Sequence, residues 1–387
     1  MLENFLSLSL LQVVGYIFPL VTLPYLARVI GVEGFGEISF AASIVAYFEA
    51  ITVFGFNYTA VREIAKIRND LNAVSVIFSN VFFAKLFLMV ISFCIFLIIV
   101  YSFPFLYKRR VVMWFTFLYI PGHIMFPDWL FQALEKMKYI TIMNFISKLI
   151  FSLLVFVVIR DSSDYIYHPV LLALGYLFSG LVSIIFLVKI LKIKFVRPRV
   201  CEIKKTLKNS FSMFVSLFLP NLYTNFSVTL LGYSNGPIDA GVFSSGKKFI
   251  DLCDQFIQIL SRTFFPFLAR KIEKHEVYAK ISFAISIVFS LFLFIGADFL
   301  IKMSISPFFL FLMNTYGVNY LVLKNHEVIL RNIVIVCSLG GFIIAWIAVI
   351  NFSYVGVAWT IMLTWGIRGY LTWFYANKVI KKCRARV

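Results

Sequence analysis

Residues 4–41 read NFLSLSLLQVVGYIFPLVTLPYLARVIGVEGFGEISFA, an apolar run followed by a glycine-rich turn. Residues 209–246 read NSFSMFVSLFLPNLYTNFSVTLLGYSNGPIDAGVFSSG, which is again an apolar run followed by a glycine-rich turn. Four landmarks recur 205 residues later, since Asn4, Gly31, Gly36 and Ser39 correspond to Asn209, Gly236, Gly241 and Ser244. An internal repeat determines the architecture of a whole chain. We therefore expect two halves of one design, in which the glycine-rich turn lets the first two helices of each half pack closely.

The composition excludes a soluble domain. Of the 387 residues, 61% are apolar and 14% are charged, whereas soluble domains are about 45–50% apolar and about 25% charged. The five cysteines and four histidines are scattered without the spacing of a disulfide framework or a metal site. We predict a polytopic membrane protein without metal or cofactor. The net charge of +18 is then explained by basic cytoplasmic loops rather than by nucleic-acid binding.

Twelve runs approach the length of about 20 apolar residues that a spanning helix needs. They are Phe5–Leu26, Ile38–Thr59, Val74–Tyr101, Val111–Leu130, Ile140–Ile159, Val170–Val188, Phe211–Gly232, Ser244–Phe267, Ile281–Leu300, Ile305–Val322, Ile333–Ile350 and Tyr354–Tyr375. The predicted fold is an all-α membrane protein with about 12 transmembrane helices in two pseudo-symmetric six-helix bundles. Residues 1–188 form the first bundle, residues 189–208 a basic cytoplasmic linker, and residues 209–387 the second bundle.

The distribution of lysine and arginine predicts the orientation. Most of these residues, including eight in the linker, fall on segments that share one side of the membrane, and that side is expected to be the cytoplasm. Both termini are then cytoplasmic. The cluster Lys108–Arg110 lies on the opposite side, against this trend. The first charge is Glu3 and no cleavage site follows it, so we expect the first apolar run to be a retained helix rather than a signal peptide.

Charged residues inside the spans are candidates for function, because each costs roughly 2.5–3.5 kcal/mol at a helix centre. One helical face of the eighth span carries five polar residues, Lys247, Asp251, Asp254, Gln258 and Arg262, with Lys248 beside it. The face could serve only an ion pair between Lys247 and Asp251 that holds helices together. We favour a wall of a water-filled cavity, because five polar residues exceed what one ion pair needs.

Lys85 and Lys148 are lone cations in the third and fifth spans. They could neutralise a carboxylate such as Glu49, or they could bind an anion such as a phosphate. Glu49 corresponds to Asp254 in the repeat, which fits paired roles with a coupling cation or proton, although coincidence is the alternative. Arg28 lies at the end of the first span. It could anchor the helix at the membrane interface, or it could be a cation at the mouth of a cavity.

Several stretches carry a family resemblance, namely PYLARVIG at 24–31, GFG at 34–36, REIA at 62–65 and PDWLFQALEKMKY at 127–139. Together they resemble the bacterial polysaccharide-unit (O-antigen) flippases of the multidrug/oligosaccharidyl-lipid/polysaccharide exporter superfamily. The resemblance implies two bundles around a central cationic cavity. It also implies an undecaprenyl-diphosphate-linked oligosaccharide substrate, moved from the inner to the outer leaflet of the bacterial inner membrane by alternating access. Membrane lipids, a polysaccharide polymerase and chain-length machinery would be the partners. Members usually have a longer segment than Asp298–Ser304 at that position.

We therefore predict a flippase whose substrate-binding cations are Arg28, Lys85, Lys148, Lys247, Lys248 and Arg262. Glu49, Asp251 and Asp254 would balance charge or couple transport to H⁺ or Na⁺, and Arg368 is a further cation within a span. One alternative is a drug or metabolite antiporter of the same superfamily. Another is a membrane-embedded polymerase or glycosyltransferase, which generally needs a large outer loop or an acidic catalytic pair. The sequence has neither, and no motif of a hydrolase, ATPase or metalloprotease.

Overall fold

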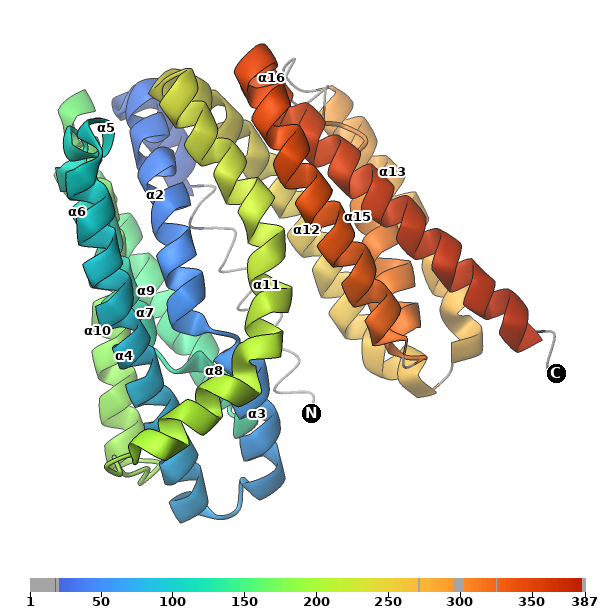
Figure 1. The fold of residues 1–387 in the computed structure, drawn as a ribbon, viewed down its shortest axis with the longest axis horizontal. Coiled ribbons are helices and arrows are strands. Elements are labelled where there is room, and N and C mark those ends of the chain that lie inside the picture. Colours follow the sequence, from blue (N-terminus) through green and yellow to red (C-terminus); the bar gives the residue numbers. More distant parts are fainter. Residues whose placement is uncertain (1–17, 19–20, 271, 296–302, 325, 385–387) are drawn as a thin grey trace. The chain divides into compact units, whose positions relative to one another are not determined.

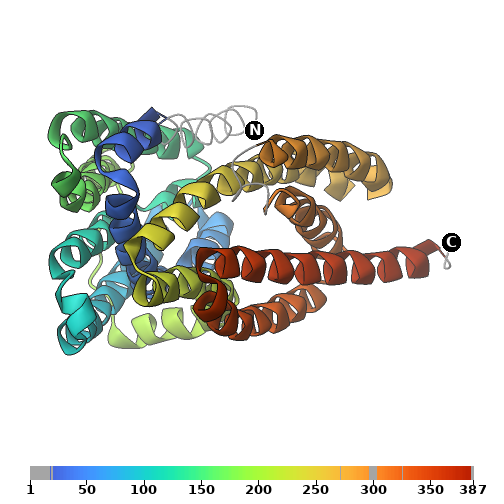
Figure 2. The same cartoon turned by 90° about the horizontal axis from the view of Figure 1, so that it is seen from above.

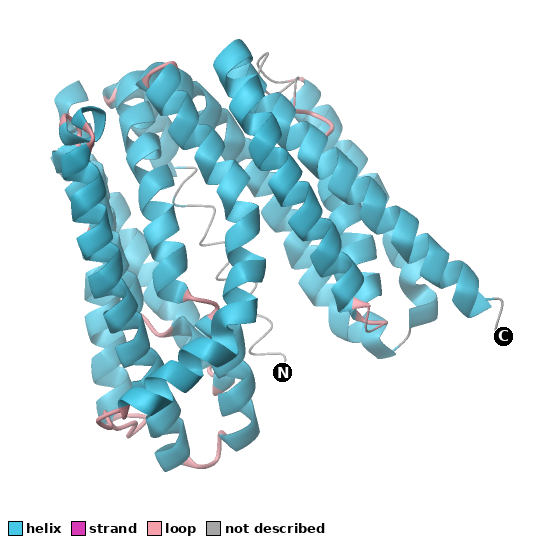
Figure 3. Cartoon of the chain, in the orientation of Figure 1, coloured by secondary structure: helices cyan, strands magenta, loops and turns pink. Residues whose placement is uncertain are grey.

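The computed structural model describes residues 18, 21–270, 272–295, 303–324 and 326–384. These residues are helical throughout, apart from turns and short connections, and contain no strand (Figure 3). Most of the first predicted span and part of the Asp298–Ser304 connection lie outside the described residues. The chain divides into two units, Met1–Phe218 and Leu219–Val387, and the division falls inside one continuous helix.

The first unit is a bundle of long and short helices (Figure 1). Residues 21–29 are helical, and they are followed by α2 (Gly31–Val53), α3 (Phe56–Ile67), α4 (Leu71–Ser102), α5 (Pro104–Tyr107), α6 (Arg110–Phe117), α7 (Tyr119–Met125), α8 (Asp128–Ala133), α9 (Met137–Val158), the 3₁₀ turn η1 (Ser162–Tyr167), α10 (His168–Lys189) and the start of α11 (Val200–Ser234). Helix α4 begins at a polar cap, because the Asp70 carboxylate accepts hydrogen bonds from the amides of Asn72 and Ala73 at 3.0 and 3.1 Å.

Two of the predicted spans are broken helices. The second breaks between α2 and α3 at Phe54 and Gly55, whose φ angles are 47° and 75°. The backbone of α11 passes so close that a Cβ on Gly55 would lie 3.0 Å from the Phe214 amide nitrogen. The buried hydroxyls of Thr59 and Ser210 share a hydrogen bond of 2.7 Å beside this break. The fourth span is divided into α6, α7 and α8. Pro127 explains the break between α7 and α8, because proline cannot continue the helical hydrogen bonds.

Residues 190–199, half of the predicted linker 189–208, form a non-helical segment that packs on α4, while residues 200–208 belong to α11. The Ser75 hydroxyl accepts a hydrogen bond from the Lys194 amide (3.0 Å), and the Ser79 hydroxyl accepts one from the Val196 amide (2.8 Å). The Phe195 ring also lies against α4, 5.2 Å from the Phe78 ring and 5.3 Å from the Phe82 ring. We call residues 190–199 the docked linker. Two serines one turn apart on α4 therefore fix its backbone.

The second unit contains the remainder of α11, α12 (Pro237–Arg270), the 3₁₀ turn η2 (Ile272–Lys274), α13 (His275–Phe294), α15 (Ser306–Leu312), the π-helix η3 (Met313–Val322) and α16 (Glu327–Arg384). Helix α16 consists of two arms that meet at Ser353, where φ is 53° and the backbone is not helical. The eleventh and twelfth predicted spans are these two arms. Helix α15 packs against both α13 and α16 (Figure 2). The tenth span is the composite of α15 and η3.

The repeated glycines have a backbone role. Gly31 and Gly236 have φ angles of 68° and 95°, which residues other than glycine rarely adopt. A Cβ on either residue would meet no atom of the described residues within 4 Å. Gly31 and Gly236 therefore make no close helix contact among the described residues, while the expectation of close packing stays a prediction for Gly36 and Gly241. Gly31 and Gly236 instead let the chain turn at the start of α2 and just before α12, at equivalent places in the two halves.

Six helical segments among the described residues are long and apolar enough to cross a membrane. They are Gly31–Val61, Leu71–Ser102, Met137–Val158, Ser162–Lys189, His275–Phe294 and Val328–Lys381. The last has 54 residues, far more than the 20 or so that one crossing needs, and the kink at Ser353 divides it into two. The chain is thus an all-α, multi-pass membrane protein, while the count of twelve spans stays a prediction.

An ion pair explains one residue of the basic cluster Lys108–Arg110, which the predicted orientation does not explain. The Arg109 Nε lies 2.6 Å from the Glu37 Oε2, and both side chains are mostly buried. The Arg109 guanidinium also lies 4.1 Å from the Phe105 ring centroid, a distance at which cations and aromatic rings attract. Arg109 therefore neutralises a carboxylate of α2 instead of acting as a free loop charge.

We expect Arg109→Gln to lower the free energy of unfolding by about 2 kcal/mol, because a hydrogen bond between charged groups contributes about 1.5–3 kcal/mol. Arg110→Gln is the matched control, since Arg110 is exposed and contacts only Tyr107 among the described residues. Thermal melting of the purified proteins in one detergent measures the difference. Equal melting temperatures for the two variants would show that the Arg109–Glu37 pair contributes nothing.

Candidate functional site

The first unit encloses a buried cation near two carboxylates. Lys85 on α4 is only 3% exposed, and its Nζ lies 3.3 Å from the Asn57 Oδ1 and 5.7 Å from the centroid of the Trp129 ring. The charges of Asp128 on α8 and Glu49 on α2 act on it. A charge buried this deeply in a membrane protein needs such partners.

Glu49 is held by aromatic neighbours that the sequence analysis did not single out. The Tyr119 hydroxyl donates a hydrogen bond to the Glu49 Oε1 at 3.2 Å, and the His123 Nδ1 lies 3.5 Å from the same oxygen. Tyr119 and His123 stack on each other with ring centroids 5.5 Å apart, and the Tyr176 ring meets Tyr119 edge-on at 4.8 Å. Tyr119 and His123 are four residues apart on α7, so they lie on one helical face. This spacing is the sequence pattern from which the pair could have been predicted.

Asp128 also has a local structural role. It is the first residue of α8, and its Oδ1 accepts a hydrogen bond from the Trp129 amide at 2.8 Å. A carboxylate at the start of a helix is favoured there because the first amides of the helix have no other partner. Asp128 thus both supports the helix that positions the buried Trp129 and contributes negative charge toward Lys85.

In the second unit, the polar face of α12 is satisfied mainly within the helix itself. The Lys247 Nζ lies 2.6 and 2.8 Å from the two carboxylate oxygens of Asp251. One turn further on, the Gln258 Nε2 donates a hydrogen bond to the Asp254 Oδ2 at 2.8 Å. The charge of Arg368 on α16 acts on Asp254 from the neighbouring helix. The face therefore contains the Lys247–Asp251 ion pair, which the simpler interpretation requires. It also contains a second carboxylate, Asp254, which has its own partners.

The other predicted site residues are placed as follows. Lys248 is half-buried on α12 beside Lys247, and Arg262 lies on α12 with its side chain outside the described residues. Arg28 is exposed at the end of its helix, and Lys148 is half-buried on α9. Neither Arg28 nor Lys148 forms an ion pair with another described residue. Among the described residues, no group of His, Cys, Asp or Glu side chains could hold a metal ion.

Apolar helices that cross a membrane and enclose charged residues between them are typical of a multi-pass membrane transporter. Known proteins support this class. A family model described as "Polysaccharide biosynthesis protein" matches residues 1–271. A protein of Escherichia coli (strain K12) named "Putative O-antigen transporter" is 26% identical over 386 residues, covering 94% of this chain and 93% of that protein.

Two solved structures have the same fold at low sequence identity. The lipid II flippase MurJ in an inward closed conformation has a TM-score of 0.64 at 14% identity, covering 95% of this chain and 87% of its own. An outward-facing multidrug resistance MATE family transporter of the MOP superfamily has a TM-score of 0.58 at 13% identity, covering 100% and 96%. Because the family model matches more than half of the chain, this protein belongs to the polysaccharide biosynthesis protein family. It is a membrane transporter rather than an enzyme.

Proposed function

We propose that this protein moves an undecaprenyl-diphosphate-linked oligosaccharide unit from the inner to the outer leaflet of the bacterial inner membrane by alternating access, for the assembly of O-antigen or a related surface polysaccharide. The observation that carries the proposal is Lys85, a cation buried inside an apolar bundle. A diphosphate is the part of such a substrate that a buried cation would attract. The family membership and the relative named as an O-antigen transporter support the substrate class.

The remaining cations extend the proposal to the second unit. Lys247 is bound to Asp251 in the structure, so a diphosphate would compete with this carboxylate for the ammonium group. Asp251 and Asp254, like Glu49 in the first unit, would then need another counter-ion, for which H⁺ or Na⁺ is suited. Arg28, Lys148, Lys248 and Arg262 are further candidates for the diphosphate. The protein would have both termini in the cytoplasm and would cooperate with a polymerase and chain-length machinery.

Deletion of the gene tests the proposed function directly. We expect the lipid-linked units to accumulate on the inner leaflet, with little sugar at the cell surface, and the wild-type gene to reverse both effects. Radiolabelled sugar incorporated into the lipid fraction measures the accumulation. If single units reach the surface of the deletion strain without being joined, the protein acts in polymerisation and the proposal is wrong.

The double variant Lys148→Ala/Lys247→Ala tests the site. We expect at least a tenfold loss of surface polysaccharide with normal protein in the membrane, because the variant removes one cation from each unit. Lys204→Ala/Lys205→Ala is the matched control, since it removes two exposed lysines of α11. Surface polysaccharide is measured at native expression levels. Normal polysaccharide in the first variant would remove both lysines from the proposed site.

A drug antiporter is the second candidate, and the fold shared with a multidrug resistance transporter is the observation that favours it. The two candidates differ in their effect on living cells. A drug exporter would leave surface polysaccharide unchanged on deletion and would make the cells sensitive to small amphiphilic compounds. We expect the opposite pattern, in which the deletion strain loses its surface polysaccharide. Its resistance to such compounds should then equal that of other strains that lack the same polysaccharide.

A further inference from the structure

The second unit contains a pocket that none of the candidate site residues lines. It has a volume of about 800 Å³ and lies between the start of α13, helix α15 with the beginning of η3, and the second arm of α16. Sites for small molecules have volumes of about 300–1,000 Å³. The pocket is therefore large enough for part of an amphiphilic molecule, and it is formed entirely by one unit.

The lining of this pocket changes from polar to apolar along its length. At one end, α13 begins and α16 approaches its last turns, and these two helices contribute His275, Glu276, Lys280, Asn377 and Lys381. Further along, the lining is dominated by rings and aliphatic groups, namely Phe283, Phe308, Phe309, Phe311, Leu312 and Tyr370. Lys280 and Lys381 are both exposed. The pocket thus joins a hydrated, positively charged end to an aromatic interior.

The dimensions fit one leaflet of a membrane. Gly366 and Lys381 both line the pocket from the same arm of α16, and fifteen residues of α-helix extend about 22 Å at 1.5 Å per residue. A bilayer is about 40–45 Å thick when its headgroup regions are included, so one leaflet measures about 20–22 Å from headgroup to midplane. A lipid with its phosphate at Lys381 would therefore place its acyl chain beside Tyr370 and Gly366.

We propose that this pocket binds an anionic phospholipid, with the phosphate at Lys280 and Lys381 and one acyl chain along the aromatic interior. An apolar ligand would make no use of the two lysines, and a free phosphate would make no use of the rings. Two lysines against the single carboxylate of Glu276 favour an anionic over a zwitterionic headgroup. Phe283, one turn after Lys280, provides the first apolar contact below the headgroup.

This lipid site is separate from the proposed transport site. None of Arg28, Lys85, Lys148, Lys247, Lys248 and Arg262 lines the pocket, so the bound lipid would stabilise the second unit rather than act as cargo. The inference therefore does not depend on the proposed function. A protein that failed to move any oligosaccharide would still be expected to hold the lipid.

Photolabelling in nanodiscs tests this site with the full-length protein. The probes are a phosphatidylglycerol and a phosphatidylcholine, each with a diazirine in one acyl chain, and mass spectrometry of peptides locates the label. We expect phosphatidylglycerol to label α13, α15 or the second arm of α16 at least fivefold more than phosphatidylcholine does. Lys280→Gln/Lys381→Gln should lower this labelling at least fivefold.

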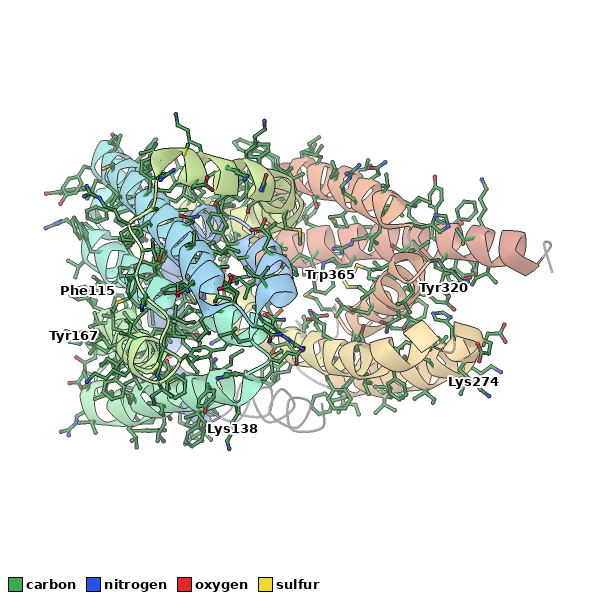
Figure 4. The ribbon with its side chains drawn as sticks, turned by 90° about the horizontal axis from the view of Figure 1, so that it is seen from below. Phe115, Lys138, Tyr167, Lys274, Tyr320 and Trp365 are labelled. Carbon is green, nitrogen blue, oxygen red and sulfur yellow. The ribbon has the colours of Figure 1, made fainter. Side chains whose placement is uncertain are left out.

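The matched control is Lys274→Gln/Lys378→Gln, which removes two exposed lysines near the same helix ends that do not line the pocket; Lys274 is labelled in Figure 4. The control should keep the wild-type labelling. Equal labelling by the two lipids would overturn the proposal, and this comparison needs only the wild-type protein. Labelling that glycerol phosphate displaces as well as phosphatidylglycerol does would also overturn it, because the acyl chain would then contribute nothing.

Discussion

Replacing Lys85 with methionine is expected to lower the free energy of unfolding by about 1–3 kcal/mol, the usual cost of leaving a buried polar group, here the Asn57 Oδ1, without its hydrogen-bond partner. Methionine fills a similar volume but removes the positive charge that interacts with Asp128 and Glu49. We also expect surface polysaccharide to fall at least tenfold. Thermal melting of the purified variant measures the first effect, and quantification of the polysaccharide in a complemented deletion strain measures the second.

A second variant separates a structural role of Lys85 from a role in binding. In Lys85→Met/Asp128→Asn, the opposing charges are removed together, and the asparagine can still accept the hydrogen bond from the Trp129 amide. We expect part of the stability to return, because Asp128 then no longer carries a negative charge that has lost the cation acting on it. Transport should stay low if Lys85 attracts the diphosphate. Recovery of transport in the double variant would assign Lys85 to folding alone.

Replacing Gly55 with valine is expected to have the second large effect, a loss of most folded protein from the membrane. Valine would be strained at a φ of 75°, and its Cβ would lie 3.0 Å from the Phe214 amide nitrogen, a backbone atom that cannot move aside as a side chain would. Strained backbone costs of order 1–3 kcal/mol by itself, and the steric conflict adds to it. The yield of monodisperse protein after extraction measures the loss.

Gly31→Ala is the matched control for this backbone effect. Gly31 also has a positive φ, of 68°, but a Cβ there would meet open space. We therefore expect Gly31→Ala to cost about 1–2 kcal/mol from strain alone and to leave folded protein in the membrane. If both variants were lost to the same extent, conformational strain would account for the whole effect and the contact between Gly55 and α11 would be unimportant.

The sequence predicts the helical class because apolar length alone determines which segments enter a membrane. It does not predict where those helices break. The break at Phe54 and Gly55 depends on the approach of Met213 and Phe214, more than 150 residues away along the chain, and periodicity within one span carries no information about such a contact. The same limit applies to the docked linker, whose composition indicates only a basic loop.

The candidate site was predictable in its charges and not in its neutral partners. A lysine in an apolar run is conspicuous, so Lys85, Glu49 and the polar face of α12 could be singled out from the sequence. Asn57 and Tyr119 carry no charge and are unremarkable in a membrane helix, although they contact Lys85 and Glu49. Arg109 shows the opposite case, because its pairing with Glu37 could not be deduced from loop charge statistics.

The docked linker has a consequence for proteolysis. By sequence, trypsin should cut after Lys192 and Lys194, between the two halves, and both lysines are indeed exposed. A protease, however, must draw several residues of backbone into its own cleft, which requires local unfolding of the substrate. The hydrogen bonds of Ser75 and Ser79 to this backbone oppose such unfolding. The rate of tryptic cleavage here would therefore report on how firmly the first bundle is folded.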